Sequence, residues 1–429
     1  METSNEHSAH RLAAGPGRAS DGSATREVSH HRESDKPLRI APDSFAFTVL
    51  LGLFAALPAL SIDVSAPTLA LLPEALGTTR TLAGLTLSLF MVGFALGQLG
   101  GGSLSDDYGR RPVLLGGLAN FILAGIACAL SLSGEVLTVC RLIQGFGAGV
   151  CSVISFAMVQ DLFEGDAARV KRSYVTMIFG GVPILAPALG SVLTAFLGWR
   201  SVHWVLALGG ALLLLITWAG VAESRLTRRD TRASSDRSAP VPLWNDSRFI
   251  AIALANALSY GAIFAYIAGS PVVIISQLGF PSGVFAAVFA CTATALAAGA
   301  WTSGRLSRLG TGAAALVTPS LIVAAAAAVG LAVVSLYGDT SGLALVPLLL
   351  LVLFTRGIIA PNLQHLAIER QRERAGVASA AVGVSQLLSG ALASAAVAIL
   401  LQSFGASAVA VPMAFLAAAA LVTWVWAAL

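Results

Sequence analysis

Long stretches without Asp, Glu, Lys or Arg recur along almost the whole 429-residue sequence. An uncharged, largely apolar run of about 18 or more residues is typical of a helix that crosses a membrane. Such runs cover residues 44–62, 81–105, 112–134, 173–199, 201–222 and 309–338. Only 11% of the residues are charged, against roughly a quarter in an ordinary soluble domain. The pattern therefore excludes a soluble globular fold.

Two further uncharged runs, 249–304 and 375–429, are each long enough for a pair of spans. Turn-like segments divide them near the middle, QLGFPSG at 277–283 and QSFGASA at 402–408. Two more spans each contain one basic residue, Arg141 and Arg356. The sequence thus predicts an all-α membrane protein with twelve transmembrane helices.

The distribution of basic residues predicts the orientation of these helices. Of 26 Lys and Arg residues, six lie in residues 1–43 and sixteen in the connections after spans 2, 4, 6, 8 and 10. Basic connections stay on the cytoplasmic side, so we expect both termini in the cytoplasm. The net charge of +4 then reflects topology, and no nucleic-acid partner is expected.

The chain is expected to have two halves. A polar linker, 223–247, separates two six-helix bundles, 44–222 and 248–429, and residues 1–43 form a disordered cytoplasmic tail. A weak internal echo supports duplication, because GSLSDDYG at 102–109 and GRLSRLG at 304–310 share Gly-x-Leu-Ser and a later glycine. Paired parallel repeats are typical of transporters whose substrate site lies near the middle of the bilayer.

Three charged residues lie inside predicted spans: Asp63, Arg141 and Arg356. Each costs about 2.5–3.5 kcal/mol in a bilayer, so such residues are usually functional. Glu74 and Glu135 mark the ends of spans 1 and 4 on the same side of the membrane. Helical rise puts Asp63 about 16 Å from Glu74 and Arg141 about 9 Å from Glu135. We therefore expect Asp63 and Arg141 to pair at a common depth. The pair is either a structural salt bridge or a proton switch, since a carboxylate between apolar groups and a guanidinium can bind and release a proton near the working pH.

The sequence contains no nucleotide-binding motif that could supply energy, and no enzyme site. Lys36 and Lys171 stand in no phosphate-binding loop, and neither HExxH nor GxSxG occurs. The four cysteines lie within spans, where they are expected to pack as small apolar residues. We expect no metal site and no cofactor. A proton gradient would be the energy source.

The connection between spans 2 and 3 carries the most specific motif, GSLSDDYGRRP at 102–112. It resembles the signature that follows helix 2 in the major facilitator superfamily. The resemblance implies that Gly102, Asp106, Gly109, Arg110, Arg111 and Asp161 form a conformational latch on the cytoplasmic side.

Further motifs are similar to one branch of that superfamily. LTVCRLIQGFGAG at 137–149 resembles its helix 4 motif, and PILAPALGS resembles its helix 5 antiporter motif through Pro183, Pro187 and Gly190. SIDVSAPTLALLPEALG at 61–77, FAYIAGSP at 264–271, GIIAPN at 357–362 and Gln386 resemble the bicyclomycin- and chloramphenicol-resistance (Bcr/CflA) drug:proton antiporters.

This resemblance implies proton-coupled efflux of small amphipathic drugs by a monomer in a bacterial inner membrane. The expected partners are a small-molecule substrate, protons and the lipid bilayer. Asp63 and Arg141 would couple the proton, and the candidate cavity residues are Gln144, Tyr260, Tyr266, Arg356 and Gln386. The alternatives are a proton-coupled importer or exporter of a metabolite on the same fold, and a membrane sensor without transport.

Overall fold

The computed structural model describes residues 40–224, 245–337, 342–371 and 375–428, which belong to one compact unit, Leu38–Leu429. Most of the predicted tail, 1–43, and of the predicted linker, 223–247, lies outside the described residues. The boundaries expected for these two segments therefore stay predictions.

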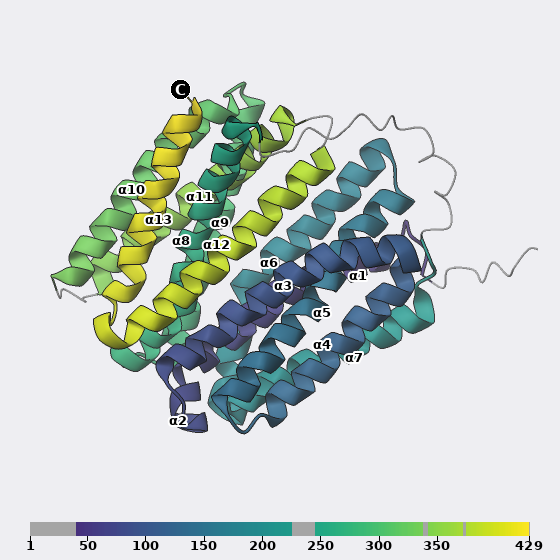
Figure 1. The fold of residues 1–429 in the computed structure, drawn as a ribbon, viewed down its shortest axis with the longest axis horizontal. Coiled ribbons are helices and arrows are strands. Elements are labelled where there is room, and N and C mark those ends of the chain that lie inside the picture. The colour runs from purple at the N-terminus through teal and green to yellow at the C-terminus, as the bar shows by residue number, and fades with distance from the viewer. Residues whose placement is uncertain (1–39, 225–244, 338–341, 372–374, 429) are drawn as a thin grey trace, which may run out of the picture. The chain divides into compact units, whose positions relative to one another are not determined.

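Helices occupy nearly all of the described chain (Figure 1). Those of the first half are α1 (Phe45–Ser65), η1 (Ala66–Ala70), α2 (Leu72–Leu76), α3 (Arg80–Tyr108), α4 (Arg110–Leu130), α5 (Gly134–Leu162), α6 (Gly165–Leu197) and α7 (Trp199–Gly220). Those of the second half are α8 (Ser247–Pro271), η5 (Val272–Gln277), α9 (Ser282–Arg308), α10 (Ala313–Leu336), α11 (Gly342–Arg370), α12 (Ala375–Phe404) and α13 (Ser407–Ala428).

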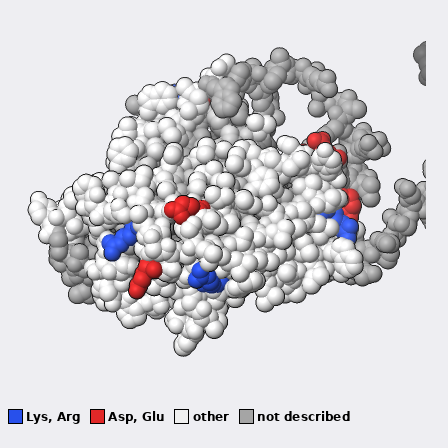
Figure 2. All heavy atoms as spheres, turned by 60° about the horizontal axis from the view of Figure 1, so that its bottom comes forward, with Lys and Arg blue, Asp and Glu red and all other residues white. Residues whose placement is uncertain are grey.

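Among the described residues, 12 helical segments are long and apolar enough to cross a membrane, six in each half. The predicted fold class is therefore confirmed. The two long uncharged runs break where the turn-like segments predicted, with left-handed glycines at Gly279 (φ 70°) and Gly405 (φ 56°). Figure 2 shows a face on which most of the surface carries no charged side chain. Outward apolar side chains such as Phe196 (82% exposed) suit contact with lipid rather than water.

Glycines allow the closest helix contacts in each half. In the first half, Gly145 of α5 lies against the Phe90 carbonyl oxygen of α3, where a Cβ would overlap it. In the second half, Gly299 of α9 lies in the same way against the Phe354 carbonyl oxygen of α11. Small residues at such crossings let helix backbones approach in a membrane. Each half thus has a glycine contact where its second and fourth spans cross.

The two halves meet along α3 with α12 and along α6 with α9 (Figure 1). A Cβ at Gly84 of α3 would overlap the Ala398 side chain of α12. The Ser191 hydroxyl of α6 donates to the Ser282 carbonyl of α9 at 3.1 Å. The Ser276 hydroxyl of η5 donates to the Ala70 carbonyl of η1 at 3.4 Å. These contacts hold the halves together at the end that carries η1 and η5.

Candidate functional site

The three charged residues predicted inside spans are the ones that the structure buries. Asp63 is 4% exposed, Arg141 2% and Arg356 4%. Within the described ranges, no other Asp, Glu, Lys or Arg side chain is buried to this degree. Burial of a charge requires compensating partners, so the surroundings of each residue indicate what it can do.

Asp63 lies where the first span changes from α-helix to 3-10 helix. Pro67 has no backbone N–H, so the Asp63 carbonyl lacks the donor four residues ahead that an α-helix would supply. The hydroxyls of Ser65 and Thr68 bond back to the Ser61 and Ser65 carbonyls, both at 2.6 Å. The sequence therefore sets the acid at a break in helical geometry.

Arg141 lies on α5, and its side chain binds residues of α1. Its guanidinium donates to the Ser61 hydroxyl at 2.9 Å, to the Ser65 hydroxyl at 3.1 Å and to the Gln144 side-chain oxygen at 2.9 Å. It also lies 4.2 Å from the centre of the Phe90 ring, close enough for a cation–π interaction. These contacts distribute the positive charge over neutral oxygens and one aromatic face.

The direct Asp63–Arg141 contact expected from the sequence is not formed in this conformation. Successive helical residues are rotated by about 100°, so Ser61 and Ser65 share one face of α1 while Asp63 points away from it. The Asp63 carboxylate makes no hydrogen bond or ion pair with any described residue.

Arg356 has partners that the sequence did not reveal. Its guanidinium donates to the Asn256 side-chain oxygen at 3.0 Å and lies 5.8 Å from the centre of the Tyr260 ring. Arg141 and Arg356 thus occupy matching places: each crosses from the fourth span of its half to the first span of that half. The Asn256 amide nitrogen is buried and has no hydrogen-bond partner among the described residues.

The other candidate cavity residues fall into separate surroundings. Gln144 is fully buried beside Arg141, and its amide nitrogen has no partner in the described part of the chain. Tyr260 stacks on Phe264 with 4.7 Å between ring centres. Tyr266 instead bonds to the Thr292 hydroxyl at 3.3 Å, and Gln386 is partly exposed on α12.

The structure brings the predicted latch residues together within the first half. Arg110 bridges Asp106 at 2.9 Å and Asp161 at 2.8 Å, and also donates to the Ser105 hydroxyl at 2.6 Å. Gly109 has φ 98° and lets α3 turn directly into α4. The arrangement ties the end of α3 and the start of α4 to the end of α5, while its role in conformational change stays a prediction.

Glu223, which sequence reasoning assigned to the linker, completes this cluster. Its carboxylate accepts from the backbone N–H groups of Arg110 at 2.8 Å and Arg111 at 3.0 Å. These are the first free donors of α4, where a negative charge is favourable. No local signal in the sequence identifies this cap, because the acid lies 113 residues from Arg110.

A second cap was also missed, at the other end of the predicted linker. Asp246 accepts from the Phe249 backbone N–H at 3.1 Å, from Arg370 at 2.7 Å and from Gln371 at 2.9 Å. Partial burial opposes its ionisation, but the bonds and charge of Arg370 with the other donors outweigh burial and lower the Asp246 pKa. Asp246 therefore links the start of α8 to the end of α11.

The helix 5 motif lies where α6 passes the break in α1. Pro183 and Pro187 are inside α6. Gly190 packs on the Val64 carbonyl, where a Cβ would overlap that oxygen. A side chain at Gly190 would thus push α6 away from the residue next to Asp63.

Twelve membrane-length helices in the described residues, with three buried charges among them, indicate a polytopic membrane protein. Residues 49–394 match the family model of the Major Facilitator Superfamily. The chain belongs to this superfamily.

Curated relatives agree with this assignment. The chain is 31% identical to an uncharacterized MFS-type transporter, YdgK, of Bacillus subtilis, over 82% of this chain and 88% of that protein. It is 34% identical to a chloramphenicol resistance protein of Pseudomonas aeruginosa, over 61% of this chain and 62% of that protein. It is 30% identical to the multidrug resistance protein MdtL of Escherichia coli, over 49% of this chain and 53% of that protein. The predicted resemblance to the Bcr/CflA branch is confirmed.

Solved structures share the fold at low sequence identity. A D-xylose–proton symporter matches with a TM-score of 0.73 and 16% identity, over 89% of this chain and 97% of that one. A POT family transporter crystallised with 5-aminolevulinic acid matches with a TM-score of 0.72 and 14% identity, over 90% and 97%. These likenesses show that the chain shares the fold of the two structures.

Proposed function

We propose that the protein exports small amphipathic compounds across a bacterial inner membrane in exchange for protons. The observation that supports this best is Asp63, a buried acid without a hydrogen-bonding or ionic partner among the described residues. An ionised carboxylate in that position is costly unless a counter-charge approaches it or a proton neutralises it. Asp63 is thus a suitable group to bind the coupled proton.

Arg141 supports the same proposal through its position. It holds Ser61 and Ser65, which flank Asp63 on α1. A small rotation of α1 or a change of the Arg141 rotamer would bring the guanidinium toward the carboxylate. Proton release from Asp63 and approach of Arg141 would then favour each other, and the substrate would bind in the state that this exchange produces.

The export direction and the drug substrates are inferred from relatives whose names refer to chloramphenicol and multidrug resistance. The aligned parts cover 62% and 53% of those proteins. Tyr260, Gln144 and Arg356 would contact a substrate that enters between the halves. The residues from Gly102 to Arg111, with Asp161, would close the pathway at the end away from η1 and η5.

Transport assays in oriented vesicles test this proposal. Inside-out vesicles with an acidic interior should accumulate chloramphenicol, and Asp63→Asn should abolish that accumulation at unchanged protein level. Asp43→Asn, which alters an exposed carboxylate before α1, serves as the matched control. Accumulation that requires right-side-out vesicles would indicate an importer. Full accumulation by Asp63→Asn would contradict the role of Asp63.

A further inference from the structure

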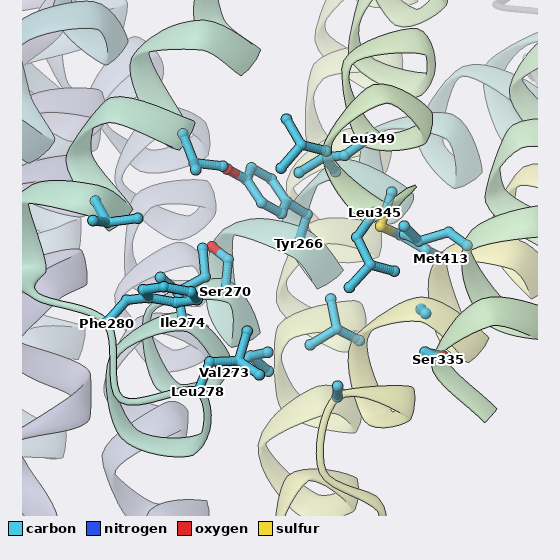
Figure 3. Close-up of a pocket in the computed structure, with 17 residues that line it drawn as sticks. Tyr266, Ser270, Val273, Ile274, Leu278, Phe280, Ser335, Leu345, Leu349 and Met413 are labelled. Atoms are coloured by element: carbon cyan, nitrogen blue, oxygen red, sulfur yellow. The ribbon is translucent and has the colours of Figure 1, made fainter. Parts of the chain in front are cut away.

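A partly open apolar pocket lies in the second half, and neither Arg141 nor Gln144 lines it. Its volume is about 390 Å³, within the range of roughly 300–1,000 Å³ that is usual for small-molecule sites. It lies among α8, η5, α9, α10, α11 and the start of α13 (Figure 3). All of its lining residues come from the second half, so it is not the passage between the halves.

The lining of the pocket excludes charged ligands. None of its side chains is Asp, Glu, Lys, Arg or His, and branched aliphatic residues supply most of the wall. An ion in such a place would be desolvated without a counter-charge, at high cost. An uncharged, largely apolar molecule would bury its apolar surface against this lining without such a cost. The pocket therefore selects against the charged groups that Asp63 and the two buried arginines would attract.

One polar group in the pocket has no partner. The Ser270 hydroxyl is buried, its residue being 4% exposed, and it has no hydrogen-bond partner among the described residues. Figure 3 shows Ser270 and Tyr266 on the same wall of the pocket. The Tyr266 hydroxyl bonds to Thr292 and lies near the Ser270 hydroxyl, but no hydrogen bond of normal geometry joins Tyr266 to Ser270. An unsatisfied buried hydroxyl is unfavourable, and a ligand with one hydroxyl or carbonyl group would satisfy it.

We propose that this pocket is a second ligand site, for an uncharged and largely apolar molecule that bonds to Ser270 through one hydroxyl or carbonyl group. The apolar part lies against η5 and the ends of α10 and α13, with Met413 and Leu349 on the far wall. The site is separate from the proton-coupling residues and does not depend on the direction of transport.

Photolabelling with an octanol that carries a diazirine tests this proposal on the full chain in lipid nanodiscs. Saturable labelling is expected on peptides from η5 and from Leu331–Ser335, competed by unlabelled octanol. Ala410→Phe, which fills the pocket from α13, should reduce this labelling about tenfold, since the site is then sterically occupied. Ala297→Phe, on an exposed face of α9, is the control and should leave labelling unchanged.

Ser270→Ala provides a second arm that leaves the volume of the pocket almost unaltered. It should weaken octanol competition about fivefold, the loss of one hydrogen bond, and leave labelling by a photoreactive alkane unchanged. Labelling that does not saturate, or that Ala410→Phe does not reduce, would overturn the proposal. Labelling in lipid-free micelles but not in nanodiscs would overturn it as well, because bilayer lipid would then fill the pocket.

Discussion

The guanidinium of Arg141 donates to the hydroxyl of Ser61 at 2.9 Å. This bond joins α5 to α1 two residues before Asp63, the one acid that is buried in the described chain. The first span thus carries the arginine's acceptors on one face and the carboxylate on the other. A rotation of this span relative to α5 changes the distance between the two charges, which gives the proposed exchange a mechanical basis.

Arg141→Lys should reduce transport about tenfold or more while the protein remains folded. A lysine ammonium lacks the planar fork of donors that reaches Ser61, Ser65 and Gln144 together. Hydrogen bonds from a charged donor each contribute ~1.5–3 kcal/mol. Uptake of chloramphenicol into acid-loaded inside-out vesicles measures the effect. Wild-type uptake by the lysine variant would show that charge alone suffices.

Glu223→Ala should destabilise the protein by ~0.5–2 kcal/mol, as expected for the loss of a helix cap. The change removes both acceptors of the Arg110 and Arg111 backbone N–H groups. Thermal unfolding in detergent, followed by helix content, measures it. Glu74→Ala, at an exposed acid of α2, is the control. Equal melting temperatures for the two variants would argue against the cap.

Gly145→Ala should destabilise the protein by ~1–3 kcal/mol through overpacking. Its Cβ would overlap the Phe90 carbonyl oxygen and separate α3 from α5. Gly116→Ala is the matched control in α4, because nothing lies within 4 Å of its Cβ position. That control should stabilise slightly, by up to ~1 kcal/mol, through helix propensity. Melting curves of the two alanine variants should therefore move in opposite directions.

The Asp246–Arg370 pair should make stability depend on pH in the acidic range. The folded protein lowers the Asp246 pKa from its ordinary value of 3.8, so the unfolded chain binds this proton at higher pH than the folded one. The stabilisation by this pair is complete at pH values above the ordinary Asp246 pKa. It disappears as the pH falls through the lowered pKa of the folded state. Asp246→Asn should flatten this part of the stability curve, as measured by melting temperature against pH. An unchanged slope would contradict the assignment.

The fold was largely predictable because the bilayer imposes a simple rule on the sequence. Eight uncharged runs, two of them divided by turn-like breaks, and two spans with one arginine each predicted the twelve helices. The three charges among apolar residues marked the ones that are buried. These signals are local. Gly109 could also be expected at a turn, since its φ of 98° favours glycine.

The partners of the buried charges could not be predicted in the same way. Counting along a continuous helix placed Asp63 opposite Arg141, but depth alone does not determine which face of α1 a side chain occupies. Pro67 also ends the α-helix just after Asp63. Glu223 was missed because its cap joins it to Arg110, 113 residues away, and the Asp246–Arg370 pair was missed because its residues lie 124 positions apart. Such contacts depend on tertiary packing.

The central claim is that Asp63 binds and releases a proton in the working protein. Infrared difference spectroscopy of purified protein in lipid, titrated from mildly acidic to mildly alkaline pH, tests it most directly. We expect a carboxylic-acid band that disappears as the pH rises in the wild type and is missing from Asp63→Asn. Identical titration difference spectra for the two proteins would contradict the account.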